Sequence, residues 1–185
     1  MITPCDVLDF WFAGDPSAQR EIWFQKDDEF DGACTCLSEA LRDAKRGAYD
    51  HWTGTPRGTL ALIILLDQLS RNLHRGSPEA FAADAKAREI ARSAVARAVD
   101  SKLGPVERMF VYLPFEHSEH FADQDESVRL AETLREALGD DSVGYAERHR
   151  DVIHRFGRFP HRNAVLGRTS TEDELAWLAE HEHGF

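Results

Sequence analysis

Arginines and histidines that could hold an anion or move a proton gather near the end of the chain. Residues 155–163 read RFGRFPHRN, which places Arg158, His161, Arg162 and Asn163 within six residues. Between residues 147 and 168, six arginines stand against two acids, in a chain whose net charge is −11. The planar guanidinium fork suits carboxylate and phosphate groups. This segment is therefore either an anion site or a set of ion pairs with acids of neighbouring helices.

A histidine lies on the apolar face of the helix that we expect just before this segment. On a helix from about Ser142 to Phe156, the inner face carries Tyr145 and Val152, and His149 falls between them. His154 points to the other side. A buried histidine is a hydrogen-bonded core residue, or it binds a ligand or transfers a proton. His149 and His161 are therefore candidates for a general acid or base.

An acid and two arginines follow the most apolar run of the chain, Leu60–Leu66. On a helix from about Thr59 to Asn72, Asp67 and Arg71 share one face, and Arg75 continues it. An acid followed by a base four residues later favours an ion pair. Either this pair closes the end of the helix, or Asp67 orients Arg71 toward an anion.

Polar residues also occupy the inner side of a helix expected from Ser118 to Leu138, whose apolar residues include Phe121. His120, Gln124 and Ser127 fall on that same side. A buried amide without hydrogen bonds costs about 1–3 kcal/mol. Gln124 therefore needs partners, which are either groups of another helix or atoms of a ligand.

The string EHSEH at residues 116–120 combines histidines and acids, the residue types that bind zinc. Its spacing is not HExxH, and His117 precedes the expected helix whereas His120 lies within it, so we expect no metal. The chain has no phosphate-binding loop, dinucleotide fingerprint or GxSxG motif, and we expect no cofactor. His117 stays a candidate for ligand binding, and Glu119 for orienting a catalytic histidine.

Composition sets limits on the class of protein. The chain has 185 residues, 42% apolar and 30% charged, which predicts one domain over residues 1–185. The negative net charge argues against nucleic acid and membrane surfaces as partners, and the longest apolar run is too short for a membrane span. Cys5, Cys34 and Cys36 are odd in number and no secretory signal precedes them, which indicates reduced, buried thiols in a cytoplasmic protein.

The elements that must position these residues are helices, because caps and three-to-four-residue spacing recur throughout. We expect helices over residues 3–14, 30–47, 59–72, 77–99, 104–114, 118–138 and 142–156, and a last one that begins at Thr171. Thr3 can cap the first helix, Gly157 ends the helix at 142–156, and Thr171 with Glu174 has the form of a capping box. We expect a loop over residues 53–58. Short loops join them, which predicts an all-α fold of about seven to nine helices. Strands at 62–66 and 109–113 are the alternative, but no alternating pattern offers them partners.

Three strings together resemble a known family: LDQLSRN at 66–72, LPFEHSE at 113–119 and RFGRFPHRN at 155–163. With VLDFWF at 7–12, the chain resembles the family called domain of unknown function 924 over nearly its whole length. The resemblance implies an all-helical fold of the tetratricopeptide-like superhelical type, in which antiparallel helix pairs stack side by side. Ser70 stands where a proline is expected in many relatives. The resemblance implies no established activity and transfers no catalytic residue.

Three functions fit these residues. In the first, stacked helices form a concave binding module, and Arg71, Arg75, Arg158 and Arg162 hold an anionic small molecule or an acidic peptide segment. In the second, the protein is a small-molecule enzyme that hydrolyses or transfers an anionic group. In the third, the polar residues form a buried network that only fixes helix packing.

The enzyme hypothesis assigns acid–base chemistry to His149 or His161, with Glu119 or Asp67 orienting the histidine. No nucleophile–base pair or metal set is recognisable, so binding is favoured over catalysis. The predicted site is built from the segments 67–75, 117–124 and 155–163, and no oligomeric state is assigned.

Overall fold

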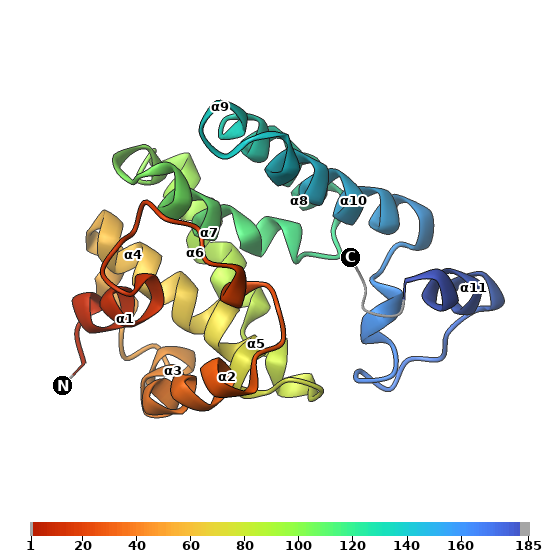
Figure 1. Ribbon diagram of the computed structural model, residues 1–185, viewed down its shortest axis with the longest axis horizontal. Helices are drawn as coiled ribbons and strands as arrows, with labels where there is room; N and C mark the ends of the chain where they lie inside the picture. Colours follow the sequence, from red (N-terminus) through yellow and green to blue (C-terminus); the bar gives the residue numbers. More distant parts are fainter. Residues whose placement is uncertain (1, 182–185) are drawn as a thin grey trace. The chain divides into compact units, whose positions relative to one another are not determined.

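The computed structural model describes residues 2–181, and all regular secondary structure in that range is helical (Figure 1). The two runs that offered strands as an alternative, 62–66 and 109–113, are both helical. Within the described range, no helix is long and apolar enough to cross a lipid bilayer. The all-α prediction is confirmed, whereas stacking of the tetratricopeptide type stays a prediction.

The chain divides into two compact units. Unit 1 comprises residues up to Arg75 and from Glu79 to Pro114, and unit 2 comprises 76–78 and the chain from Phe115 onward. The α-helices of unit 1 are α1 (Pro4–Phe12), α2 (Asp28–Cys34), α3 (Ser38–Lys45), α4 (Pro56–Ile63), α5 (Ser70–Leu73), α6 (Asp84–Ala96) and all but the end of α7 (Pro105–Glu116). That one domain spans residues 1–185 stays a prediction.

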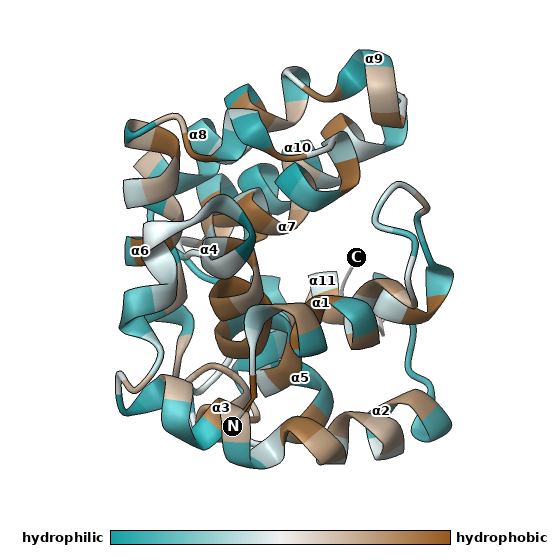
Figure 2. Cartoon of the chain, turned by 90° about the vertical axis from the view of Figure 1, so that its left-hand side faces the viewer, coloured by the Kyte–Doolittle hydropathy of each residue, from teal (hydrophilic) through white to brown (hydrophobic). Residues whose placement is uncertain are grey.

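The centre of unit 1 is the helix that the apolar run forms. Every residue from 58 to 70 is buried, and α1, α3 and α6 pack around this segment. Its turns are the brown stretch between the labels α4 and α5 in Figure 2. Aromatic rings of Trp11, Trp23 and Phe110 contact each other beside it. Burial on all sides explains why the run is apolar all round.

This central helix begins earlier than its apolar pattern suggested. Thr55 is its N-cap and accepts a hydrogen bond from the Gly58 amide, and Pro56 occupies the first turn. A Cβ at Gly58 would lie 2.3 Å from the carbonyl oxygen of Trp52, so only glycine fits. The expected loop at 53–58 is therefore replaced by the turn η3 (Asp50–Gly54) and a helix start.

The helix is also not regular along its length. Between α4 and α5 the backbone forms a π-helical segment, η4 (Ile64–Leu69), which includes Asp67. The wider π turn changes which residues share a face, and such segments are frequent at functional sites. The uniform α-helix expected over 59–72 is thus interrupted where its first polar residue lies.

Two other expected helices of unit 1 are interrupted by 3₁₀ turns. The stretch 30–47 contains the 3₁₀ turn η2 (Thr35–Leu37), where the Thr35 hydroxyl donates to the Gly32 carbonyl and the Ser38 hydroxyl to the Thr35 carbonyl. After Ser77, a 3₁₀ turn η5 (Pro78–Ala80) comes first, and α6 begins only at Asp84.

Unit 2 is organised around a helical hairpin. Its helices are α8 (Phe121–Glu132), α9 (Arg135–Leu138), α10 (Asp140–Phe156) and α11 (Glu172–Glu180), with the 3₁₀ turn η7 (Pro160–Arg162) before the last. Helices α8 and α10 lie side by side and run in opposite directions (Figure 1). Gly157 ends α10 in the left-handed conformation at φ 70°, and Thr171 forms the expected capping box with Glu174.

Three expectations for this region were wrong. Helix α7 does not stop at Pro114 but continues to Glu116, since a proline in the last turn removes only one hydrogen bond. Helix α8 begins at Phe121 rather than at Ser118, whose hydroxyl instead donates to the Asp123 carboxylate at 2.7 Å. Phe121 and Tyr145, expected inside, are 51% and 49% exposed.

The cysteines are only partly as expected. All three are free thiols, and Cys34 is buried, but Cys5 and Cys36 are exposed. Cys5 lies in the first turn of α1 and Cys36 in the turn η2, at positions that face away from the core. Burial raises the pKa of the Cys34 thiol to about 12, which makes it chemically inert.

Candidate functional site

The predicted ion pair in the central helix of unit 1 is present. Arg71 Nη1 lies 3.2 Å from Asp67 Oδ1, and Asp67 is fully buried. Both terminal nitrogens of Arg71 also donate to the Asp84 carboxylate at 3.0 Å. Burial opposes the charge on Arg71, but Asp67 and Asp84 together raise its pKa. The guanidinium is thus held between two acids.

Arg75 is also committed to an acid of unit 1. Its Nε and Nη2 donate to the two oxygens of Asp31, at 2.7 and 2.9 Å. The side-chain amide of Asn72 donates to the same carboxylate at 2.7 Å. These bonds join the end of α5 to α2 and occupy the fork that was predicted to hold an anion.

In unit 2, Arg158 forms a comparable pair with Glu174. The two oxygens of Glu174 accept from Arg158 Nε at 2.6 Å and from Nη2 at 2.8 Å. Glu174 is 2% exposed and also accepts from the Thr171 amide and the Asn163 side chain. The hydrogen bonds from Arg158 lower the pKa of Glu174 to about 2. This pair fixes the start of α11.

Glu119 supports the backbone around Phe159. It accepts two hydrogen bonds from Arg168, at 2.8 and 3.0 Å, and one from the Phe159 amide at 2.8 Å. Arg168 also donates to the Phe159 carbonyl. Burial favours the neutral carboxyl, but the bonds from Arg168 lower the pKa of Glu119. Glu119 therefore holds the loop around Phe159 in place, and its role in orienting a histidine stays a prediction.

The Phe159 ring lies at the centre of a group of nitrogen-bearing side chains within unit 2. Phe159 is fully buried, and its ring centre lies 5.6 Å from that of His149 and 5.4 Å from that of His161. The Arg162 guanidinium lies 4.4 Å from the same ring centre. Arg162 also donates to the His117 carbonyl, and the His117 and His149 rings are 6.5 Å apart. We call these five residues the Phe159 cluster.

The protonation of His149 follows from its surroundings. Burial, aided by His117, Arg162 and His161, lowers its pKa to about 3, so the ring is neutral at pH 7. Its Nδ1 lies 2.9 Å from the Tyr145 carbonyl, which can only accept, so Nδ1 carries the proton. This hydrogen bond opposes the shift, and a Glu116 oxygen lies 3.5 Å from the same Nδ1.

His161 is neutral for the same reasons. Burial is the main cause, followed by the charge of Arg162, and together they lower its pKa to about 4. Glu119 opposes this shift, whereas Arg168 adds to it. Two neutral imidazoles beside a buried arginine form a nitrogen-rich, weakly solvated environment.

Two amide oxygens in unit 2 are buried without a hydrogen-bond donor, Gln124 Oε1 and Asn163 Oδ1. The amino group of Gln124 donates to the carbonyls of Glu116 and Ser118, at 2.7 and 2.6 Å, which places the side chain beside His117. The amino group of Asn163 donates to Ser170 and Glu174. A buried acceptor normally has a donor from protein, water or ligand.

The predicted site residues therefore separate into three groups. His117, His149, His161 and Arg162 meet in the Phe159 cluster, and Gln124 and Asn163 contribute buried amides to the same unit. Glu119 and Arg158 are engaged in ion pairs of unit 2. Asp67, Arg71 and Arg75 form ion pairs within unit 1.

Sequence reasoning missed the residues that organise these groups. Phe159 was not predicted as a site residue, although its ring contacts three of the candidate side chains. Asp84, Asp31 and Arg168 were not singled out as partners. The capping box marked Glu174 as a helix start but gave no sign of its pairing with Arg158. His120, part of the histidine–acid string, is exposed at the N-cap of α8.

Comparisons with known proteins agree on the family. The family model described as "Bacterial protein of unknown function" matches residues 7–182. A solved structure of a protein of unknown function from Agrobacterium tumefaciens is 38% identical and superposes with a TM-score of 0.86, over 96% of this chain and 97% of that one. No curated protein matches. The chain belongs to the family of bacterial proteins called domain of unknown function 924.

Proposed function

We propose that this protein is a helical binding module that holds a small anion, phosphate or carboxylate, at the Phe159 cluster of unit 2. The observation that carries the proposal is the placement of His149, His161 and Arg162 around one buried ring. Arg162 can donate to the anion, and each imidazole can donate to it once the free nitrogen takes up a proton; such bonds gain strength because the surroundings are poorly solvated. An anion would add negative charge beside two imidazoles that burial keeps neutral.

The proposed site uses fewer arginines than the anion site expected from the sequence. Arg71, Arg75 and Arg158 each direct two nitrogens at a carboxylate, so their forks are occupied. Taking a ligand would require each of them to break a bidentate pair, which is costly when one partner is buried. Arg162 contacts the Phe159 ring and donates to the His117 carbonyl, beside the same ring that His149 and His161 contact.

The buried amides indicate what else the ligand carries. Gln124 Oε1 and Asn163 Oδ1 are acceptors, so a ligand that meets them must offer an O–H or N–H. Monohydrogen phosphate and hydroxy- or amino-carboxylates combine an anionic oxygen with such a donor. A fully deprotonated anion without donors would leave both oxygens unsatisfied.

The test is a thermal-shift and calorimetric titration with inorganic phosphate, lactate, acetate and an acidic tetraglutamate peptide. A ligand at 100 times its dissociation constant should stabilise the protein by about 2.7 kcal/mol. We expect a shift with phosphate or lactate that is lost in Arg162→Gln and His161→Gln. It should persist in Arg155→Gln, which removes an exposed arginine of the same segment.

The outcomes separate the ligand classes. A response to the peptide alone would replace the small anion by an acidic protein segment as the ligand. The absence of any shift, or a shift that survives both cluster variants, would overturn the proposal. His161→Gln guards against misreading an unfolded Arg162→Gln, because a partly exposed imidazole is easier to replace than a buried guanidinium.

Proton uptake offers an independent readout. A bound anion favours the charged form of a neighbouring histidine and raises its pKa. Because the pKa values of His149 and His161 start at about 3 and 4, binding should take up protons and tighten as the pH falls from 7.5 to roughly 5.5. Calorimetry in two buffers with different ionisation enthalpies measures that uptake directly.

The Glu116–His149 contact supports a second candidate, acid–base catalysis. With Nδ1 protonated and facing Tyr145 and Glu116, Nε2 is the atom of His149 that can accept a proton. A pKa near 3 makes the unliganded histidine a weak base at pH 7, which favours binding over catalysis. Turnover of phosphate or carboxylate esters that disappears in His149→Gln would reverse that preference.

A further inference from the structure

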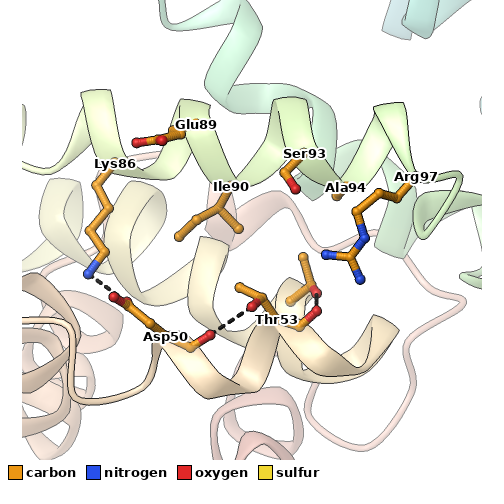
Figure 3. A pocket seen from close by; sticks show the side chains of 9 residues that line it. Asp50, Thr53, Lys86, Glu89, Ile90, Ser93, Ala94 and Arg97 are labelled. Carbon is orange, nitrogen blue, oxygen red and sulfur yellow. Dashed lines mark hydrogen bonds and ion pairs between the residues drawn. The ribbon is translucent and has the colours of Figure 1, made fainter.

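Unit 1 has a pocket of its own, which no predicted site residue lines. It has a volume of about 280 Å³ and lies between the turn η3 with the start of α4 on one side and one face of α6 on the other (Figure 3). Helix α6 contributes residues three or four apart, the spacing of a single helical face. The lining residues are Asp50, Thr53, Thr59, Lys86, Glu89, Ile90, Ser93, Ala94 and Arg97.

Charges occupy the two ends of this pocket. At one end Lys86 is already neutralised, because its ammonium lies 2.7 Å from Asp50 and donates to the Ala44 carbonyl. Arg97 lies at the other end, with its guanidinium turned toward Thr53 (Figure 3). Neither Arg97 nor Glu89 forms an ion pair with another described residue. The guanidinium of Arg97 and the carboxylate of Glu89 are thus available to a ligand.

The wall between the two ends is mixed in character. Ile90 and Ala94 supply apolar surface, and Ser93 supplies a hydroxyl one turn before Arg97. The hydroxyls of Thr53 and Thr59 donate to backbone carbonyls and keep their capacity to accept. This combination suits a short polar ligand with an apolar or backbone-like middle.

We propose that this pocket binds a small zwitterion of the amino-acid or short-peptide type, with its carboxylate on Arg97 and its ammonium on Glu89. A dianion would be repelled by Glu89 and a dication by Arg97, whereas a zwitterion satisfies both. Glu89 lies in α6 and Arg97 is the C-cap of that helix, eight positions further along, which corresponds to a rise of roughly 12 Å. An extended peptide spans about 3.5 Å per residue, so a tripeptide has a fitting length. The site is independent of the Phe159 cluster.

The experiment is a calorimetric titration of the full chain with glycine, diglycine and triglycine. We expect triglycine to bind most tightly of the three. N-acetyl-triglycine and triglycine amide, which each lose one terminal charge, should bind about tenfold more weakly or worse. Arg97→Gln and Glu89→Gln should weaken triglycine binding by about the same factor.

Arg42→Gln and Glu29→Gln are the matched controls, because they remove exposed charges of unit 1 that do not line the pocket. Both should bind triglycine as the wild type does. Absence of saturable binding by all three peptides overturns the proposal. So does equal binding of the end-blocked peptides, or binding that survives both pocket variants. The failure of phosphate to bind the Phe159 cluster has no bearing on this result.

Discussion

The central helix of unit 1 and the Phe159 cluster of unit 2 differ in how nitrogen-bearing side chains are accommodated in the protein interior. Arg71 lies between two carboxylates, so its charge is matched on both sides. Around Phe159, two imidazoles remain neutral and Arg162 contacts a ring and a carbonyl. The first arrangement stabilises helix packing, and the second is the arrangement on which the proposed anion site rests.

The difference shows why a local excess of arginine is a poor guide to a binding site. Arg158 and Arg168 belong to the same arginine-rich segment as Arg162, yet each is paired with an acid of unit 2. The charge excess counted along the sequence is thus largely cancelled in space. What distinguishes the Phe159 cluster is burial of nitrogen-bearing rings, which the pKa values of His149 and His161 express.

Arg71→Ala tests the ion pairs of the central helix directly, and we expect it to have the largest effect on stability. Removing the guanidinium takes away the cation that lies between two carboxylates, the fully buried Asp67 and Asp84. Breaking a buried pair in this way typically costs about 3–5 kcal/mol. Urea denaturation at pH 7 measures the loss. A cost below about 1 kcal/mol would mean that water replaces Arg71 and that the network is not a packing device.

A double variant isolates the pair itself. Arg71→Ala combined with Asp84→Ala should cost less than the two single variants added together, because the second change removes one of the two carboxylates that Arg71 neutralised. Additive costs would place the loss in side-chain packing rather than in charge.

Arg158→Ala should destabilise unit 2, by less than Arg71→Ala destabilises unit 1. The buried Glu174 keeps its bonds from Thr171 and Asn163, and Arg158 is partly exposed. Since the pKa of Glu174 is lowered to about 2, the pair contributes fully above pH 4.5 and its contribution is lost as the pH falls toward 2. The stability gap between wild type and variant should therefore narrow from pH 7 to pH 3.

Arg42→Ala, which removes an exposed arginine, serves as the control and should show no gap at either pH. If Arg158→Ala has the same free energy of unfolding as the wild type at pH 7, Arg158 is again a candidate for ligand binding.

His149→Gln tests the burial of a neutral imidazole in the Phe159 cluster. The pKa of His149 is lowered in the folded state, so its contribution is complete above the unfolded value of 6.5 and is lost as the pH falls toward 3. One such group gives a slope of about 1.4 kcal/mol per pH unit. Between pH 6.5 and 5.5, the stability of His149→Gln should fall less steeply than that of the wild type by up to that amount.

His120→Gln is the matched control, because His120 is exposed and its side chain caps nothing. Its slope should equal that of the wild type. An equal slope in His149→Gln would show that His149 is solvated and would weaken the case for the Phe159 cluster as a poorly solvated site.

Sequence gave reliable information where the determining contacts are local. Thr3 and Thr171 were predicted as caps, and each forms a capping box with a residue three positions later. Gly157 was predicted to end a helix and adopts a left-handed conformation. The prediction failed at Ser118 and Thr35 because their hydroxyls bond to other nearby groups, an option that composition does not reveal.

The site was only half predictable for a similar reason. A histidine on an apolar face and a loop of Arg, His and Asn are visible in the sequence, and they led to His149 and the residues after Phe159. Their partners are not visible, because pairing between distant residues depends on packing. Asp84, Glu174 and Asp31 lie 13, 16 and 44 residues from the arginines that they bind.

Arg75→Ala should have the smallest effect, although the Arg75–Asp31 contact looks as good as the pairs discussed above. Both bonds are short, but the Arg75 side chain is 40% exposed, so solvent screens the charges and Asp31 can hydrate when the partner is removed. Pairs of this kind contribute about 0.2–1 kcal/mol. Urea denaturation in low salt and in 1 M NaCl provides the test, since the Debye length falls to about 3 Å in the latter.

The small difference between Arg75→Ala and wild type should disappear in high salt, whereas the larger cost of Arg71→Ala should persist because its partner Asp67 is fully buried and out of reach of ions. Arg71 and Arg75 both form short ion pairs but differ in exposure. Comparing the two variants therefore shows whether burial or bond geometry determines the contribution to stability. If both variants responded to salt alike, the central helix would be more open to solvent than the complete burial of Asp67 implies.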